Sequence, residues 1–244
     1  MVKNYQKWFL ARVKKAIYRY GMLEDGDRVV VAFSGGKDSF TLLRALSLLQ
    51  RTLPLRFDLA AVFVRLGWLM DLTVMEEFCR DLQIPFYVQE TEIAKIVFEE
   101  RQEGSPCAIC SHLRRGALHS KALELGFNKI ALGHHLDDVL ETFLMSLIYT
   151  GQLRVFAPAT FLDRTGLTMI RPMVALTAED IREFVRREQL PTVSNPCPAN
   201  GQTSRETMKD LVNELAERFP TLRARFLTAL QNFDPNNLWP DQER

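Results

Sequence analysis

Residues able to bind phosphate gather early in the chain, directly after an apolar run rich in valine. Residues 34–39 read Ser-Gly-Gly-Lys-Asp-Ser, between a predicted strand at 29–33 and a predicted helix at 40–49. The two glycines allow a sharp turn and a close approach to a ligand, and the helix start offers unpaired N–H groups at the positive end of its dipole. Lys37 adds a mobile charge, and Asp38 can cap the helix or hold a phosphate-bound metal. We predict a phosphate-binding loop that lacks the spacing of a Walker loop.

A set of cysteines gives the second chemical signal. Cys107 and Cys110 are separated by two residues at a predicted loop-to-helix junction, so both sulfurs can bind one metal centre, and a helix start favours the thiolate. Cys197 lies between two prolines that stiffen a later loop. Zinc, an iron–sulfur cluster with three thiolates and one open iron, and a redox dithiol are the alternatives. Cys79, within a predicted amphipathic helix, is interpreted as part of the core.

Composition indicates an ordinary globular chain. Its 244 residues are 47% hydrophobic and 25% charged, with a formal net charge of +1. We expect a cytoplasmic protein that does not enter a membrane, because no apolar run could span a bilayer and the N-terminus lacks a secretory pattern. A net charge near zero gives no global sign of nucleic-acid binding, so if RNA binds, the positive charge that contacts it must be local. Arg114 and Arg115 are the candidates for such contacts; surface charge on a helix is the alternative.

The order of predicted elements indicates an α/β fold. Apolar strands at 29–33, 57–64, 84–88, 129–132 and 169–173 alternate with helical segments. This predicts a doubly wound, mainly parallel sheet of about five strands with helices on both faces and ligands at the carboxyl ends of the strands. Residues 151–168 are predicted to be irregular. We expect an N-terminal helix at 1–21, an α/β domain with the phosphate-binding loop at 22–190, and a cysteine-bearing loop with C-terminal helices at 191–244, packed on the same domain.

Several separated segments together resemble a known family. Ser-Gly-Gly-Lys-Asp-Ser at 34–39 is the PP-loop pattern of ATP pyrophosphatases, which adenylate an oxygen of a substrate and release pyrophosphate. The sequences at 107–110, 113–116, 131–138 and 170–172, with the loop around Cys197, resemble the tRNA 2-thiocytidine synthetases. That family uses ATP and a 4Fe-4S cluster to replace the 2-oxygen of an anticodon-loop cytidine by sulfur. The resemblance covers most of the chain and implies this activity.

The resemblance also implies roles for individual residues. Cys107, Cys110 and Cys197 would hold the cluster and leave one iron open. Asp38 with Asp137 or Asp138 would bind Mg²⁺. From the residues alone, the adjacent acids could instead be a solvated helix start, and His134 and His135 could be capping or packed imidazoles, so neither is assigned as a general base. The residues implied to bind ATP are Ser34, Gly35, Gly36, Lys37, Asp38, Ser39, Gly133 and His134, and those implied in catalysis are Lys37, Asp38 and Asp138.

Two functions other than tRNA thiolation are also compatible with these motifs. The tRNA lysidine synthetases share the PP-loop and adenylate a cytidine, but they need no thiols. A nucleotide-responsive, RNA-binding module with structural zinc would need no catalysis. The thiolation hypothesis implies tRNA as the partner, free sulfide or a cysteine desulfurase as the sulfur donor, and a homodimer.

The sequence departs from the family pattern at the predicted adenine site. This chain has Arg65-Leu66-Gly67-Trp68 after the second strand, where the family carries a short polar or acidic residue near the adenine.

Overall fold

A single mixed sheet organises the chain. The computed structural model describes residues 6–100, 106–194, 196–198 and 204–239. Within them, six strands form a sheet in the order β3-β2-β1-β4-β6-β5, in which β5 alone runs antiparallel to its neighbour. The strands are β1 (Asp27–Ala32), β2 (Phe57–Arg65), β3 (Phe86–Glu90), β4 (Lys129–Ala131), β5 (Ala159–Leu162) and β6 (Leu167–Ile170). The predicted α/β sheet is confirmed, with one strand more than expected.

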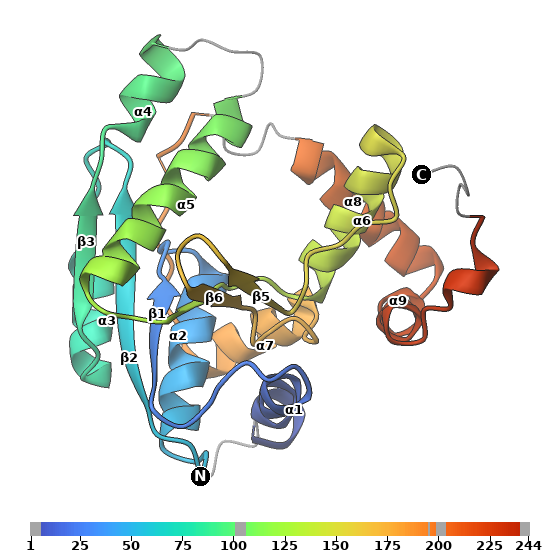
Figure 1. The fold of residues 1–244 in the computed structure, drawn as a ribbon, viewed down its shortest axis with the longest axis horizontal. Helices are drawn as coiled ribbons and strands as arrows, with labels where there is room; N and C mark the ends of the chain where they lie inside the picture. The colour runs from blue at the N-terminus through green and yellow to red at the C-terminus, as the bar shows by residue number, and fades with distance from the viewer. Residues whose placement is uncertain (1–5, 101–105, 195, 199–203, 240–244) are drawn as a thin grey trace.

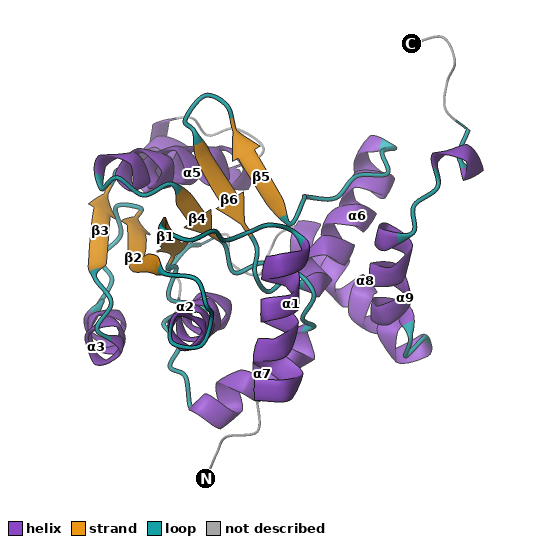
Figure 2. Cartoon of the chain, turned by 60° about the horizontal axis from the view of Figure 1, so that its bottom comes forward, coloured by secondary structure: helices purple, strands orange, loops and turns teal. Residues whose placement is uncertain are grey.

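Helices cover both faces of this sheet (Figures 1 and 2). One face carries α5, and the other carries α1, α2, α3 and α7. Short helical turns lie at Gln6–Leu10, Ile96–Glu100 and Pro235–Asn237. The helices are α1 (Ala11–Arg19), α2 (Lys37–Gln50), α3 (Thr73–Leu82), α4 (Ile93–Lys95), α5 (Pro106–Glu124), α6 (Leu136–Thr150), α7 (Ala178–Glu188), α8 (Ser204–Arg218) and α9 (Leu222–Gln231).

The alternation of side chains along β1 divides the core into two layers. Val29 and Val31 pack into a cluster with α1, α2 and α7, whereas Val30 packs into a second cluster with α5. All three valines are fully buried, as expected for a central parallel strand covered on both faces. Cys79 lies in the first cluster and is 1% exposed, which confirms its assignment to the core.

The region predicted to be irregular contains a β-hairpin, so that prediction was wrong. Residues 159–162 and 167–170 pair antiparallel at the edge of the sheet. The turn between them contains Gly166 at φ +69°, a conformation that glycine adopts without strain. Turn-forming residues in this stretch indicate a loop, but β-favouring residues on both sides of a short turn also indicate a hairpin.

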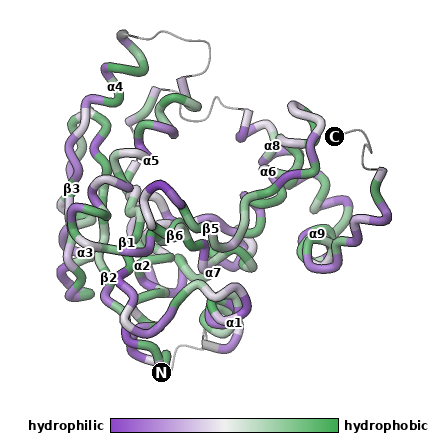
Figure 3. Tube along the Cα trace, viewed as in Figure 1, coloured by the Kyte–Doolittle hydropathy of each residue, from purple (hydrophilic) through white to green (hydrophobic). Residues whose placement is uncertain are grey.

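The C-terminal helices lie beside α6, away from the sheet (Figures 1 and 2). Helix α8 packs along α6, and α9 contacts both. Helix α6 is coloured hydrophobic over much of its length in Figure 3. It buries Val139 and Leu140, whereas Ile148 and Tyr149 near its end are exposed. No helix in the described ranges is both long and apolar enough to cross a membrane.

Candidate active site

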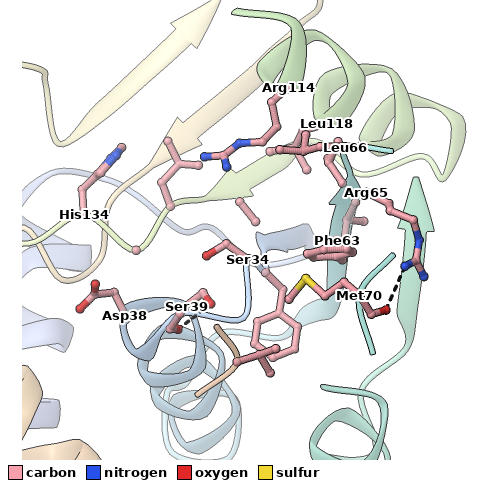
Figure 4. A pocket seen from close by; sticks show the side chains of 18 of the residues that line it. Ser34, Asp38, Ser39, Phe63, Arg65, Leu66, Met70, Arg114, Leu118 and His134 are labelled. Atoms are coloured by element: carbon pink, nitrogen blue, oxygen red, sulfur yellow. Dashed lines mark hydrogen bonds between the residues drawn. The ribbon is translucent and has the colours of Figure 1, made fainter. Parts of the chain in front are cut away.

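A pocket of about 580 Å³ opens at the carboxyl ends of β1, β2 and β4. This is where a parallel sheet places its ligands. Figure 4 shows side chains of the phosphate loop, of α5 and of the loop after β4 around this space. The predicted site residues that line it are Ser34, Gly36, Asp38, Ser39, Arg114, Gly133, His134 and Asp138.

The phosphate loop is shaped by its glycines and by a serine. Gly36 is extended and precedes the first residue of α2, so the first amide groups of this helix have no carbonyl acceptor in a preceding turn. Ser39 donates its hydroxyl to the carbonyl of Gly36 over 2.8 Å and closes this turn. Gly35 has φ +82°, and a Cβ there would lie 3.3 Å from the Cβ of Val193. The loop therefore needs glycine both for its conformation and for its packing.

Lys37 and Asp38 form an ion pair at the start of α2. The Lys37 Nζ lies 2.6 Å from Oδ1 of Asp38, and both side chains are partly exposed. Asp38 is among the residues that line the pocket, whereas the predicted ATP-binding residues Gly35 and Lys37 are not among them. A bound phosphate or Mg²⁺ would compete for both members of the pair, because a cation attracts the carboxylate and an anion attracts the ammonium.

Gly133 allows the loop after β4 to pack against the start of α2. A Cβ at this position would lie 3.2 Å from both the carbonyl carbon and the oxygen of Asp38. This close contact brings the N-terminal end of α6 to the phosphate loop. As a result, Asp38 and Asp138 line one pocket although they are far apart in the sequence.

The two adjacent acids of α6 have different surroundings. Asp137 is buried; it accepts a hydrogen bond from the amide of Ala178 over 2.7 Å and pairs with Arg223 over 2.6 Å. Asp138 accepts from the amide of His135 over 2.8 Å with one oxygen, and its other oxygen lies 3.4 Å from Arg205. Asp137 therefore connects α6 to α7 and α9, whereas Asp138 lines the pocket.

The two histidines also differ. His135 is buried at the start of α6, and its Nε2 lies 3.8 Å from Oδ1 of Asp38. His134 lines the pocket, and its Nδ1 lies 3.3 Å from Nε of Arg171. Burial lowers the pKa of His134 to about 4, so the imidazole is neutral at pH 7.

The apolar side of the pocket is formed at the end of β2. Phe63, Leu66 and Met70 line it there. The side chain of Arg65 is occupied: it pairs with Glu90 over 3.0 Å and donates to the carbonyl of Met70 over 3.0 Å. The wall offered to a ligand at the end of β2 is therefore largely apolar (Figure 4).

Three predicted cysteine ligands lie near enough to interact electrostatically. Burial raises the pKa of Cys110, Arg114 opposes this effect, and the thiols of Cys197 and Cys107 add to it. Cys107 is exposed, whereas Cys110 and Cys197 are half-buried. Among the described residues, no three His, Cys, Asp or Glu side chains form a group that could hold a metal ion. A 4Fe-4S cluster binds each thiolate through a different iron, so its ligands need not surround one ion.

Sequence reasoning missed several residues of the pocket. Arg205 of α8, Pro196 and Val193 line it together with the apolar residues of β2. Pro196 and Val193 belong to the segment that carries Cys197, and the proline-rich character of that segment was the available signal. No sequence pattern indicated that Arg205 would reach the pocket. Arg114 and Arg115 are both exposed on α5, and Arg114 is the one that lines the pocket.

Comparison with known proteins decides the family. A model of the PP-loop domain matches residues 6–215. The tRNA-cytidine(32) 2-sulfurtransferase of Syntrophotalea carbinolica is 42% identical over 92% of this chain and 88% of its own length. This chain belongs to the tRNA-cytidine(32) 2-sulfurtransferase family. The sulfurtransferase of Pelobacter propionicus is 39% identical over 94% of this chain and 87% of its own.

Solved structures support the fold of this sulfurtransferase family member. The U34-tRNA thiolase NcsA from Methanococcus maripaludis, solved with its [4Fe-4S] cluster, superposes with a TM-score of 0.76 at 20% identity. The match covers 94% of this chain and 80% of that one. The NH3-dependent NAD synthetase of Campylobacter jejuni superposes with a TM-score of 0.54 at 13% identity, over 96% of this chain and 90% of its own. The predicted PP-loop fold is confirmed.

Proposed function

We propose that this enzyme adenylates the 2-oxygen of a cytidine in the tRNA anticodon loop, at position 32, and replaces that oxygen by sulfur. One observation carries the proposal. The phosphate loop, Asp138 and the segment bearing Cys197 meet at one pocket, in a chain 42% identical to a tRNA-cytidine(32) 2-sulfurtransferase. The names of the relatives favour thiolation over lysidine synthesis and over a non-enzymatic zinc module.

The pocket suits ATP with its phosphates at the start of α2. The amide groups of the first turn and Lys37 would bind the phosphates, and the apolar wall at Phe63 and Leu66 would contact the adenine. Asp38 and Asp138, which face the same space, are the proposed Mg²⁺ ligands. Mg²⁺ prefers carboxylate oxygens and is commonly held between one or two acids and the phosphates of a substrate.

The reaction has two balanced steps. A ring carbonyl oxygen is a poor leaving group, so the cytidine 2-oxygen attacks the α-phosphorus of ATP, and the bond from that phosphorus to pyrophosphate breaks. Lys37 would stabilise the charge on the departing pyrophosphate, and Mg²⁺ held by Asp38 and Asp138 would supply further positive charge there. Hydrosulfide then attacks carbon 2, the bond between carbon 2 and the original oxygen breaks, AMP leaves with that oxygen, and the sulfur loses its proton to solvent. Arg114 lines the pocket and acts electrostatically on Cys110, so it lies on the side from which sulfur would arrive.

Cys107, Cys110 and Cys197 are the proposed ligands of the iron–sulfur cluster. The support is the electrostatic effect of Cys107 and Cys197 on the thiol of Cys110, together with the position of Cys107 and Cys110 in the first turn of α5. A cluster with three protein thiolates would supply one open iron able to bind sulfur. Arg115 is the proposed outer contact for tRNA phosphate. The sulfur donor, the homodimer and the cytoplasmic location stay predictions.

Thiolation of unmodified tRNA tests this proposal. The protein is purified without oxygen, supplied with iron, sulfide and MgATP, and assayed for 2-thiocytidine by mass spectrometry and for pyrophosphate. Cys107→Ser, Cys110→Ser and Cys197→Ser should each abolish thiolation while ATP still binds, and the core variant Cys79→Ser should retain thiolation. Bound zinc with no pyrophosphate, or a product formed only with lysine, would overturn the proposal.

A further inference from the structure

A buried guanidinium lies behind the pocket and contacts His134. Arg171, directly after β6, is 6% exposed. Its Nη1 donates to the carbonyl of Ala157 over 2.6 Å and lies 3.4 Å from the hydroxyl of Thr160. Its Nε donates to Nδ1 of His134 over 3.3 Å. These partners hold the guanidinium in one orientation.

An aromatic ring fixes the same arrangement from the side. The Arg171 guanidinium lies 4.8 Å from the centre of the Phe156 ring, and the His134 ring centre lies 4.9 Å from it. Phe156 therefore packs against both members of the hydrogen-bonded pair. The imidazole has little freedom to flip, because a flip would place a carbon atom where Nδ1 now meets Arg171.

The hydrogen bond from Arg171 determines where the imidazole carries its proton. A guanidinium donates hydrogen bonds and accepts none, so Nδ1 of His134 must be the unprotonated acceptor. A neutral imidazole then carries its hydrogen on Nε2. Burial keeps His134 neutral at pH 7. Within the described part of the chain, Nε2 has no hydrogen-bond partner, and His134 lines the pocket.

We infer that Arg171 is a positioning residue that fixes His134 as the Nε2–H tautomer, so that His134 donates a hydrogen bond to a substrate oxygen in the pocket. The inference rests on the proposed function for the identity of that oxygen: an α-phosphate oxygen of ATP or of the adenylated cytidine. Negative charge increases on this oxygen as the α-phosphorus is attacked, and an oriented N–H group stabilises it. His134 is accordingly a donor and not the base that removes a proton.

Nitrogen NMR of the whole protein tests the tautomer without requiring catalysis. In protein labelled with ¹⁵N-histidine, with His134→Gln used to assign the signals, His134 should show an unprotonated Nδ1 and a protonated Nε2 at pH 7. Arg171→Met should mix or reverse this pattern, whereas Thr160→Val should preserve it, because it removes another partner of Arg171 and leaves the imidazole contact. A protonated Nδ1 in the unsubstituted protein overturns the inference.

The kinetics of two substitutions at His134 test whether its side chain donates or accepts a hydrogen bond in the pocket. The amide nitrogen of Gln can replace the Nε2–H donor, whereas the carboxylate of Glu cannot. His134→Gln should therefore retain roughly 10- to 100-fold more pyrophosphate-forming activity than His134→Glu. Equal activity, or more with Glu, overturns the donor role. If no pyrophosphate forms even in the unsubstituted enzyme, the proposed function fails, and the NMR result still decides the tautomer.

Discussion

The backbone amide of Val193 donates a hydrogen bond to the carbonyl of Gly35 over 2.8 Å. This bond joins the phosphate loop to the segment that carries Cys197, four residues further along the chain. The Cβ of Val193 also lies against Gly35, so close that a side chain on Gly35 would crowd it. The position of the cysteine-bearing segment is therefore coupled to the conformation of the predicted phosphate loop.

Removing this amide should weaken nucleotide binding. Val193→Pro deletes the donor, and we expect the Kd of MgATP to rise roughly 3- to 10-fold, the effect of one net hydrogen bond. Val193→Ala keeps the amide and is the matched control, with a Kd close to that of the unsubstituted protein. Isothermal titration calorimetry measures both. Equal Kd values for the two variants would show that the bond does not support the phosphate loop.

A methyl group at Gly133 should separate the two acids of the pocket. Gly133→Ala places a Cβ 3.2 Å from the backbone of Asp38, which has to shift, so ATP affinity should fall. Gly116→Ala is the control, because nothing lies within 4 Å of a Cβ at that helical position; it should stabilise α5 by up to about 1 kcal/mol. Calorimetric titration and thermal unfolding measure the two effects. Unchanged ATP affinity in Gly133→Ala would contradict the close-approach argument.

Replacing the two adjacent acids of α6 by asparagine should have different effects: one substitution should lower stability and the other should weaken Mg²⁺ binding. Asp137→Asn leaves Arg223 without its buried partner and should lower the free energy of unfolding by about 2–4 kcal/mol. Asp138→Asn keeps an oxygen for the His135 amide but removes a carboxylate from the pocket, so it should raise the Mg²⁺ concentration needed for activity. Urea unfolding and Mg²⁺ titration distinguish them. A Mg²⁺ defect confined to Asp137→Asn would reverse our assignment.

Glu141 should make stability depend on pH. Burial and the nearby Asp138 raise its pKa to about 7, so between pH 4.5 and 7 the folded chain binds more protons than the unfolded chain. The stabilising contribution of the protonated carboxyl is fully present below pH 4.5 and is lost as the pH rises through 7. Glu141→Gln should therefore stabilise the protein at pH 8, by on the order of 1–3 kcal/mol, and should have little effect at pH 4.

Urea unfolding in EDTA at both pH values measures this effect. Glu217→Gln, an exposed substitution on α8, is the matched control and should change the free energy of unfolding by less than about 0.5 kcal/mol. A Glu141→Gln variant less stable than the unsubstituted protein at pH 8 would mean that the ionised carboxylate is stabilising.

Local sequence patterns predicted the sheet and the phosphate loop because both depend on neighbouring residues. Val29 to Val31 form a buried strand, and the glycines after it form the turn. The partners of Asp137 could not be predicted, since Arg223 and the Ala178 amide reach it from distant helices. The same holds for Arg205, whose place in the pocket depends on how α8 packs on α6.

The most direct test of the account follows the oxygen atom that is replaced. Unmodified tRNA is prepared with ¹⁸O at the 2-position of the anticodon-loop cytidine and is reacted once with MgATP, sulfide and the iron-loaded enzyme without oxygen. Mass spectrometry then locates the label. We predict that it appears in AMP, in equal amount with 2-thiocytidine. Unlabelled AMP formed together with 2-thiocytidine, or labelled cytidine left intact while pyrophosphate accumulates, would contradict adenylation of that oxygen.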